Sequence, residues 1–287
     1  MKPVNFDYVL ADTVAEVCTV LHHEGAQARI IAGGQSLGAM LNMRLATPSL
    51  IVDINRINGL DMIDVKEGFV VTGATVRQAT ALVHPAILHY VPLLAKALPH
   101  VGHYQTRSRG TLAGSVVHAD PSAEIPLVLA VLGGAVELVS RKRRRKIPAR
   151  DFILSSLATA KAEDEIVVAL HWPTAAPQDR FAFAEKAMRA GDFALVAAAC
   201  HLEKTNDGMP VCLTIGFAGC GEKFQFLTLP VPKIVGHNFA YDVAEQAAAA
   251  IKCQGDIHAS AAYRLNLVKL MARALTQEVF AADTIGG

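Results

Sequence analysis

The sequence predicts an α+β fold in two domains, and three observations indicate it. Short strand-like runs alternate with helical patterns over residues 12–172. Proline and alanine then cluster in residues 173–177, directly after a strand-like run, which is typical of a linker. Beyond this linker, two longer strand-like runs are followed by two helical stretches. The 287 residues are enough for two domains with sizeable cores.

Residues 12–54 predict two helices and two strands joined by tight turns. Apolar residues at helical spacing follow a residue of the type that caps helices, and Gly25 marks the end of the first helix. Gly33 and Gly34 end the next strand and precede a second helix. The predicted elements are a helix from Asp12 or Thr13 to His23, a strand over 28–32, a helix over 36–44 and a strand over 50–54.

The next part, up to residue 172, mixes strands with apolar helices. Thr75 is expected to cap a short helix after the first of these strands. The stretch Arg107–Ser115 is polar and contains glycine, so we expect a loop there. The other predicted elements are a strand over 68–74, helices over 92–101 and 123–132, and strands over 135–140, 146–148 and 166–172.

Five basic residues, 141–145, lie between two of these strands. We interpret them as the solvated tip of a hairpin. A nuclear signal or a nucleic-acid patch would need flanking disorder or stacking aromatic residues, and neither is present. After the linker, the sequence predicts strands over 194–203 and 211–218 and helices over 241–251 and 259–276, with no internal repeat.

Composition and charge narrow the function classes. Hydrophobic residues make up 52% and charged residues 18%, which is typical of a globular protein. The 27 basic and 26 acidic residues nearly cancel, so bulk charge gives no reason to expect binding to nucleic acid or to an anionic membrane. No apolar run reaches the roughly 18 residues that a membrane span needs. The first residues lack the apolar core of a secretory signal.

The cysteines argue against a metal site or a disulfide framework. Their number is odd and no two form a CxxC pair, the spacing that zinc sites and iron–sulfur clusters use. Unpaired cysteines of this kind are typical of a protein in the reducing cytoplasm. We therefore expect no metal on this chain, and any redox role would need an organic cofactor. The five residues are Cys18, Cys200, Cys212, Cys220 and Cys253.

Two glycine-containing segments carry the first chemical signals. In the first, adjacent glycines between a strand and a helix allow backbone N–H groups to approach an anionic phosphate. This segment matches neither GxGxxG nor the Walker pattern, and a purely structural tight turn explains it equally well. We name it the first glycine loop, and its sequence is Ala32-Gly33-Gly34-Gln35-Ser36-Leu37.

The second glycine loop, residues 107–115, combines glycines with hydroxyl groups, and Glu124 follows at an expected helix start. Hydroxyl and N–H groups suit phosphate oxygens, while a carboxylate suits a sugar or ribityl hydroxyl. His118 could be a metal ligand or a base, but a packing role is favoured because no partner lies at ligand spacing. Two such loops suggest one long diphosphate ligand, such as a dinucleotide.

Taken in order, these motifs resemble the FAD-binding medium subunit of molybdenum hydroxylases. This is the flavoprotein family of carbon monoxide dehydrogenase, nicotine dehydrogenase and xanthine dehydrogenase, and the similarity extends over nearly the whole chain. The matching segments are Phe6-Asp7-Tyr8, residues 31–37, residues 50–54, Arg109-Gly110-Thr111 through Glu124, residues 185–196 and Gly216-Phe217-Ala218-Gly219.

The resemblance implies a fold and a set of FAD contacts. It implies a PCMH-type FAD-binding domain, similar to that of vanillyl-alcohol oxidase, over residues 1–175, with α+β subdomains at about 1–57 and 58–175. A C-terminal α+β domain of the carbon monoxide dehydrogenase flavoprotein type would cover 178–287. The implied FAD contacts are Ala32, Gly33, Gly34, Gln35, Ser36, Leu37, Thr111, Gly114, Ser115, Glu124, Val167 and Lys186.

The same resemblance implies an electron carrier without catalytic or metal-binding residues of its own. Substrate, an N-heterocycle or an aldehyde, would be hydroxylated at a molybdopterin centre on a large subunit. Electrons would pass through [2Fe–2S] clusters on a small subunit to FAD on this chain, and then to an acceptor. The expected assembly is a cytoplasmic dimer of heterotrimers.

Two positions depart from the family pattern. Gln35 stands where relatives often have histidine, which excludes covalent attachment of FAD at this residue. Ala113 replaces the first of two adjacent glycines in the second loop.

Two other hypotheses remain open. A stand-alone flavoenzyme would need a base near the flavin, for which Glu185, Arg189 and Asp192 are the clustered residues. A salt-bridged network is the more ordinary interpretation of these three. A flavin-free scaffold subunit is the third possibility.

Overall fold

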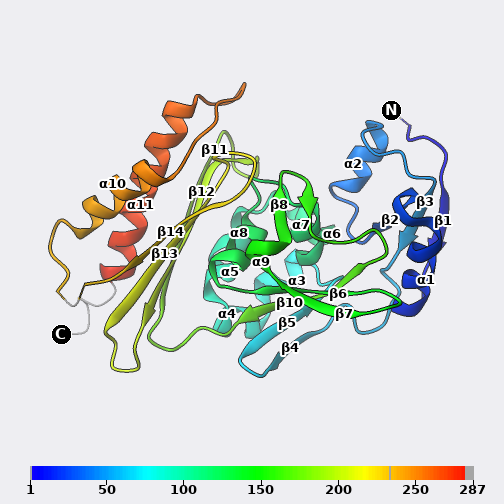
Figure 1. Cartoon of the computed structure of the whole chain (residues 1–287), viewed down its shortest axis with the longest axis horizontal. Coiled ribbons are helices and arrows are strands. Elements are labelled where there is room, and N and C mark those ends of the chain that lie inside the picture. Colours follow the sequence, from blue (N-terminus) through cyan, green and yellow to red (C-terminus); the bar gives the residue numbers. More distant parts are fainter. Residues whose placement is uncertain (1, 233, 282–287) are drawn as a thin grey trace.

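The computed structural model describes residues 2–232 and 234–281, and in this part of the chain four sheets form (Figure 1). Three of the sheets have three or more strands, and helices lie between and beside them. The predicted α+β class is therefore confirmed. The three larger sheets follow one another along the sequence.

The first sheet is parallel, with strand order β1–β3–β2. Parallel neighbours need crossover connections, and helices supply them. Thr13 caps the first helix by accepting a hydrogen bond from the Glu16 N–H at 3.1 Å, and Gly25 ends it, as predicted. The elements are β1 (Asp7–Leu10), α1 (Val14–Glu24), η1 (Gly25–Gln27), β2 (Ala28–Ile31), α2 (Leu37–Asn42) and β3 (Leu50–Asp53).

The second sheet is antiparallel, with strand order β4–β5–β10–β6–β7. Its central strand is an apolar run that is buried along almost its whole length. The strands are β4 (Ile63–Lys66), β5 (Phe69–Gly73), β6 (Ala135–Val139), β7 (Arg144–Pro148) and β10 (Ile166–Pro173).

Helices fill the long connection between β5 and β6. The last of them, α8, is buried on all sides, which explains its uniformly apolar sequence. They are α3 (Gln78–Val83), α4 (Pro85–Tyr90), α5 (Pro92–Ala97), η2 (Leu98–His100), α6 (Tyr104–Arg109), α7 (Leu112–His118) and α8 (Glu124–Val131). Short elements after β7 are α9 (Ala149–Phe152), β8 (Ile153–Ser155) and β9 (Ala158–Thr159).

The third sheet is an antiparallel meander in sequence order, covered on each face by helices (Figure 1). Side chains alternate between the two faces of each strand, which explains why both faces of the sheet are covered. Phe181 and Phe183 pack against the core that includes α5 and α8, while Ala182 and Ala184 pack toward α10 and α11. The elements are β11 (Arg180–Ala187), β12 (Ala194–Lys204), β13 (Pro210–Ala218), β14 (Gln225–Pro230), α10 (Phe239–Ala250) and α11 (Ala261–Ala281).

The predicted loop over residues 107–115 is wrong, because most of it is helical. Helices α6 and α7 meet at a two-residue turn of Gly110 and Thr111. The Thr111 side chain accepts a hydrogen bond from the Gly114 N–H at 2.9 Å and so caps α7. The predicted Thr75 cap is also wrong: α3 begins only at Gln78, and Thr75 is buried in the preceding turn.

Six strands were not predicted from the sequence: β1, β4, β11, β14 and the very short β8 and β9. β1 and β4 are only four residues long and mostly exposed, so they lack a clear hydrophobic alternation. Strands β11 and β14 are the outer strands of the meander, defined by pairing with β12 and β13 rather than by local pattern.

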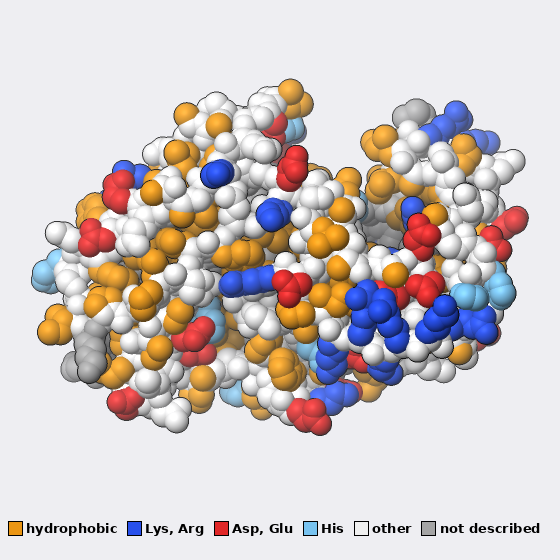
Figure 2. All heavy atoms as spheres, viewed as in Figure 1, with side chains coloured by type: hydrophobic (Ala, Val, Ile, Leu, Met, Phe, Trp, Pro, Cys, Tyr) orange, Lys and Arg blue, Asp and Glu red, His pale blue; other side chains and the backbone are white. Residues whose placement is uncertain are grey.

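The basic run is only partly a hairpin tip. Strand β7 begins at Arg144, and Arg144 and Arg145 make ion pairs with Glu137 and Glu165. Figure 2 shows the Lys and Arg side chains gathered over the β6–β7 turn. The expectation of a wholly solvated tip is therefore corrected, because two nearby carboxylates draw these side chains onto the sheet.

Candidate functional site

The first glycine loop leaves β2 and enters α2 with an unusual backbone. Gly34 has φ +70°, a backbone conformation that residues other than glycine rarely adopt. Ser36 is the N-cap of α2 and makes no side-chain capping bond. The Gln35 side chain donates to the Gly33 carbonyl at 3.2 Å, so it folds back onto the loop itself.

The two glycine loops touch each other. A Cβ added to Gly33 would overlap the Arg109 carbonyl oxygen and lie 2.9 Å from the Gly110 Cα. Only glycine therefore allows this approach. Segments 76 residues apart in sequence, Gly33 and Arg109, thus form one continuous backbone surface.

Arg77 and Asn55 hold this contact in place. The Arg77 guanidinium donates to the Arg109 carbonyl oxygen and, at 2.6 Å, to Asn55 Oδ1. Asn55 Nδ2 in turn donates to the Ala32 carbonyl oxygen at 2.8 Å. Burial, and then the nearby Arg109 charge, lowers the pKa of Arg77. Sequence reasoning missed both residues, and no local signal marked them.

The backbone of helix α7 is exposed to solvent at Gly114. Gly114 is exposed, and a Cβ there would meet only the Thr111 hydroxyl, at 2.7 Å. Ala113 is 3% exposed and belongs to the hydrophobic core. The Ala113 methyl group therefore lies in the core, away from the exposed backbone of Gly114.

These features fit a diphosphate. The Leu112 and Gly114 N–H groups of α7 already donate, to the Val76 carbonyl oxygen and to the Thr111 hydroxyl, so N–H donors to an anion come from the other first residues of α2 and α7. The hydroxyl groups of Ser36, Thr111 and Ser115 lie on the same two segments. The cationic Arg77 and Arg109 stand beside the loop contact. Hydrogen-bond donors, glycine backbone and positive charge are the set that an FAD pyrophosphate requires.

Glu124 and Glu185 form a second polar group. Glu124 begins α8 and is 7% exposed, and its carboxyl group lies near that of Glu185 on β11. Burial, opposed in part by hydrogen bonds, raises the pKa of Glu124 to about 7. Burial and the Glu124 charge raise the pKa of Glu185 to about 8. We call these two residues the carboxyl pair.

A cavity of about 270 Å³ adjoins the carboxyl pair. It lies between η2 and the end of β11, and its lining includes His100, Glu185, Lys186 and Arg189. Burial lowers the pKa of His100. Lys186 is exposed and, by strand alternation, is directed to the face of β11 opposite Glu185. Val167, in β10, is 4% exposed and lies within the core.

The salt-bridged network expected of Glu185, Arg189 and Asp192 is wrong. Glu185 pairs with Glu124, because its row on β11 faces α8. Arg189 and Asp192 are exposed in the turn after β11, where the Asp192 N–H donates to the Arg189 carbonyl at 3.1 Å.

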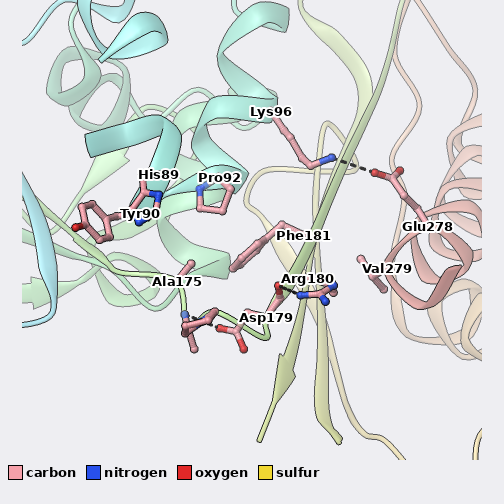
Figure 3. Close-up of a pocket in the computed structure, with 12 residues that line it drawn as sticks. His89, Tyr90, Pro92, Lys96, Ala175, Asp179, Arg180, Phe181, Glu278 and Val279 are labelled. Carbon is pink, nitrogen blue, oxygen red and sulfur yellow. Dashed lines mark hydrogen bonds and ion pairs between the residues drawn. The ribbon is translucent and has the colours of Figure 1, made fainter. Parts of the chain in front are cut away.

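A larger cavity, of about 670 Å³, lies on another part of the molecule (Figure 3). The ion pair between Lys96 and Glu278, at 3.2 Å, crosses its edge, and Tyr90 and Phe181 contribute aromatic surface. Its lining includes none of the predicted site residues. We therefore place the candidate site at the glycine loops and the carboxyl pair.

Residues 2–232 and 234–281 lack two further kinds of feature. No group of three or more His, Cys, Asp and Glu side chains is arranged to hold a metal ion in these ranges. Within the same ranges, no helix combines the length and the apolar character needed to cross a bilayer.

Residues 4–175 match the FAD-binding domain family of molybdopterin dehydrogenases. The chain is 35% identical to the 6-hydroxypseudooxynicotine dehydrogenase complex subunit alpha of Paenarthrobacter nicotinovorans, over 94% of this chain and 93% of that one. It superposes with a TM-score of 0.90 on a chain of quinoline 2-oxidoreductase from Pseudomonas putida 86, at 34% identity, covering 97% and 98% of the two chains. Carbon monoxide dehydrogenase from Hydrogenophaga pseudoflava contains a chain with TM-score 0.92 and 26% identity, covering 98% and 99%.

The family match covers more than half of the chain, and the relatives align over nearly all of it. The resemblance inferred from the motifs is thereby confirmed. The chain belongs to the family of FAD-binding medium subunits of molybdenum hydroxylases.

Proposed function

We propose that this chain holds one FAD without a covalent bond and transfers electrons within a molybdenum hydroxylase. The observation that carries the proposal is the contact between the two glycine loops, which brings the backbone of both loops together beside the Arg77 guanidinium. Gln35 offers no imidazole for covalent attachment, and its amide bonds to the loop backbone.

In this proposal the chain binds FAD with the residues inferred from the sequence. Residues 32–37 hold the pyrophosphate from one side, and Thr111, Gly114 and Ser115 hold it from the other. Glu124 meets FAD hydroxyl groups, and Val167 and Lys186 line the flavin ring. Arg77 positions the two loops and adds positive charge beside the phosphates.

Bound FAD would supply two-electron redox chemistry. The chain's own residues bind the cofactor, orient it and limit the access of water. We propose that these tasks are divided between an FAD-binding domain over 1–175, with subdomains at about 1–57 and 58–175, and a C-terminal domain over 178–287. Residues 1, 233 and 282–287 of these ranges lie outside the described residues.

The proposed partners are a large molybdopterin subunit and a small [2Fe–2S] subunit, assembled as a dimer of heterotrimers. The proposed substrate of the complex is an N-heterocycle or an aldehyde. Quinoline 2-oxidoreductase, at 34% identity, supports the first class. The glyceraldehyde dehydrogenase medium chain of Sulfolobus acidocaldarius, at 30% identity, supports the second. We place the assembly in the cytoplasm, where the five free cysteines stay reduced.

The loop contact can be tested by FAD content. The purified chain should release about one FAD per polypeptide on acid or heat treatment. Gly33→Ala should lose most of its FAD, because the added methyl forces the two loops apart. Gly38→Ala is the matched control, since a Cβ there meets nothing within 4 Å. Equal FAD content in the two variants, measured by absorbance after denaturation, would show that the loops do not bind the cofactor.

Rapid mixing distinguishes an electron carrier from a stand-alone flavoenzyme. With its molybdenum and iron–sulfur partners, the chain should show substrate-dependent bleaching of the flavin. Alone, it should be reduced by dithionite but not by organic substrate. Fast bleaching of the isolated chain by substrate would favour the stand-alone enzyme, with Glu185 as the group to test first.

A further inference from the structure

Two of the motif segments contribute no residue to the proposed FAD contacts. They are Phe6-Asp7-Tyr8 and residues 50–54, and they supply the parallel neighbours β1 and β3. Tyr8 lies opposite Ile51, and Asp53 follows further along β3 on the same face of the sheet. The Tyr8 hydroxyl donates to Asp53 Oδ2 at 2.6 Å. Because the last residue of β2 also pairs with Asp53, the two segments meet where the first glycine loop begins.

Asn55 extends this contact to the first glycine loop. Its backbone N–H and its side-chain Nδ2 both donate to Asp53 Oδ1, at 2.8 and 2.6 Å. Nδ2 also donates to the Ala32 carbonyl oxygen at 2.8 Å, and Oδ1 accepts from Arg77 at 2.6 Å. Asp53 and Ala32 offer only acceptors to this amide, whereas Arg77 offers only donors. The surroundings therefore allow the Asn55 amide to lie only one way round.

Arg77 carries the connection across to the second glycine loop. Its guanidinium bonds to Asn55 and to the Arg109 carbonyl oxygen. The Arg77 backbone forms a bridge with Thr111, and the N–H of the next residue donates to the Gly110 carbonyl oxygen at 2.9 Å. Arg77 is thus fixed to the second loop by its main chain and to Asn55 by its side chain. We call the four residues joined by these side-chain bonds the loop relay: Tyr8, Asp53, Asn55 and Arg77.

We propose that the loop relay sets the spacing of the two glycine loops for the FAD pyrophosphate, and that Tyr8 and Asp53 are positioning residues that act through Asn55. The inference rests on the proposed function, since it needs the pyrophosphate at these loops. The relay bonds to one carbonyl oxygen of each loop, that of Ala32 and that of Arg109. Carbonyl oxygens repel an anion, so their occupation by relay donors favours a phosphate at the loops.

The relay lies at the surface, which separates its role from that of the core. Tyr8 is 56% exposed, and Asn55 is exposed as well. Substitutions at exposed positions usually change the stability of a fold very little. Loss of the Tyr8 hydroxyl should therefore leave the folded chain intact and change only how the two loops are held. A binding measurement can detect that change, whereas an unfolding measurement should not.

The test is the FAD affinity of the full chain, measured by isothermal titration after its FAD has been removed. Tyr8→Phe should weaken binding about 5-fold and Asp53→Asn about 20-fold, the losses expected for a neutral and a charged hydrogen bond. Tyr263→Phe, at an exposed tyrosine on α11, is the matched control and should bind as wild type. Wild-type affinity in both relay variants would overturn the proposal. So would a loss of affinity in Tyr8→Phe that is matched by an equal loss of stability in urea.

A double-mutant cycle tests whether Tyr8 acts through the relay. Tyr8 and Asn55 make no hydrogen bond to each other in the described residues, so separate effects on FAD affinity would multiply. If Tyr8 acts through Asn55, Tyr8→Phe should weaken binding in the wild-type background and hardly at all in Asn55→Ala. Equal fold losses in the two backgrounds would overturn the proposal.

ADP gives a second readout, because it carries a pyrophosphate without a flavin. Tyr8→Phe should weaken ADP binding by the same factor as FAD binding. A loss for FAD alone would overturn the proposal, since the effect would then lie outside the pyrophosphate site. A wild-type chain that binds no FAD would instead overturn the proposed function, so the two failures are distinguishable.

Discussion

Two groups of buried carboxylates in this protein have opposite surroundings. On the second sheet, Glu165 is 1% exposed and accepts two hydrogen bonds of 2.7 Å from Arg145. Glu137 is bonded to Arg144 and, at 2.6 Å, to His171. The carboxyl pair of Glu124 and Glu185 has no such cation and includes an unpartnered oxygen.

The pKa values follow from this difference. Burial alone would raise the pKa of Glu137 and Glu165, but hydrogen bonds and charges from their basic partners lower both. At the carboxyl pair, burial dominates and both pKa values rise. Compensated carboxylates stabilise a fold, whereas an uncompensated pair costs stability and is characteristic of functional positions. We infer that the first group is structural and the second functional.

The largest expected effect is at Glu165. Glu165→Ala leaves Arg145 without its bidentate partner, and breaking a buried pair of this kind costs about 3 kcal/mol. The measurement is the free energy of unfolding in urea at pH 7. Glu163→Ala, an exposed neighbour, is the control and should change stability by less than about 0.5 kcal/mol. A similar loss in both variants would contradict the structural role of Glu165.

The next effect concerns ligand binding by the carboxyl pair. Glu124→Ala should weaken FAD binding by about 2 kcal/mol, the usual cost of removing a hydrogen bond to a charged group. Isothermal titration of the apo-chain with FAD measures this change. Glu137→Ala should leave FAD affinity unchanged, since Glu137 is committed to Arg144 and His171. If both substitutions weaken binding alike, the functional assignment of the pair is wrong.

The two groups should also respond to pH in opposite directions. For Glu185 the folded-state pKa is raised from 4.5 to about 8, so its contribution to stability is present below pH 4.5 and is lost as pH rises through 8. For Glu137 the pKa is lowered, so its contribution is present above pH 4.5 and is lost on acidification. Each proton changes the slope of the free energy of unfolding against pH by at most about 1.4 kcal/mol per pH unit.

Unfolding of the apo-chain between pH 3 and 9 measures these slopes. Glu185→Gln should remove the alkaline loss of stability, and Glu137→Gln should remove part of the acid loss. Parallel pH profiles for the two variants would eliminate the distinction between the groups.

The smallest effect tests how much an exposed cation contributes. The Arg144 side chain is 68% exposed although it pairs with Glu137. Arg144→Gln should therefore cost less than about 1 kcal/mol in urea unfolding, because solvent screens the interaction and His171 still bonds to Glu137. A loss well above about 1 kcal/mol would contradict the small contribution expected of this exposed cation.

The sequence alone predicted the α+β class, the first glycine loop and most helices and strands, whereas most of the second glycine loop is helical. Local signals made these predictions possible. Thr13 and Gly25 mark the two ends of α1, and the apolar runs of α8 and β10 indicate buried elements. Adjacent glycines identified the first loop because their backbone freedom is a property of the residue itself. The order of the motifs along the chain identified the family, because this order can be recognised without knowing any three-dimensional contact.

Only the tertiary structure decided what surrounds these motifs. It joined Gly33 to Arg109 through Arg77 and turned the Ala113 methyl into the core. It also placed Glu185 against Glu124, 61 residues away, where the sequence suggested a salt bridge with Arg189 or Asp192. The physical reason is that the charge state and burial of a side chain depend on neighbours that the folded chain brings from distant segments, and local patterns do not encode those neighbours.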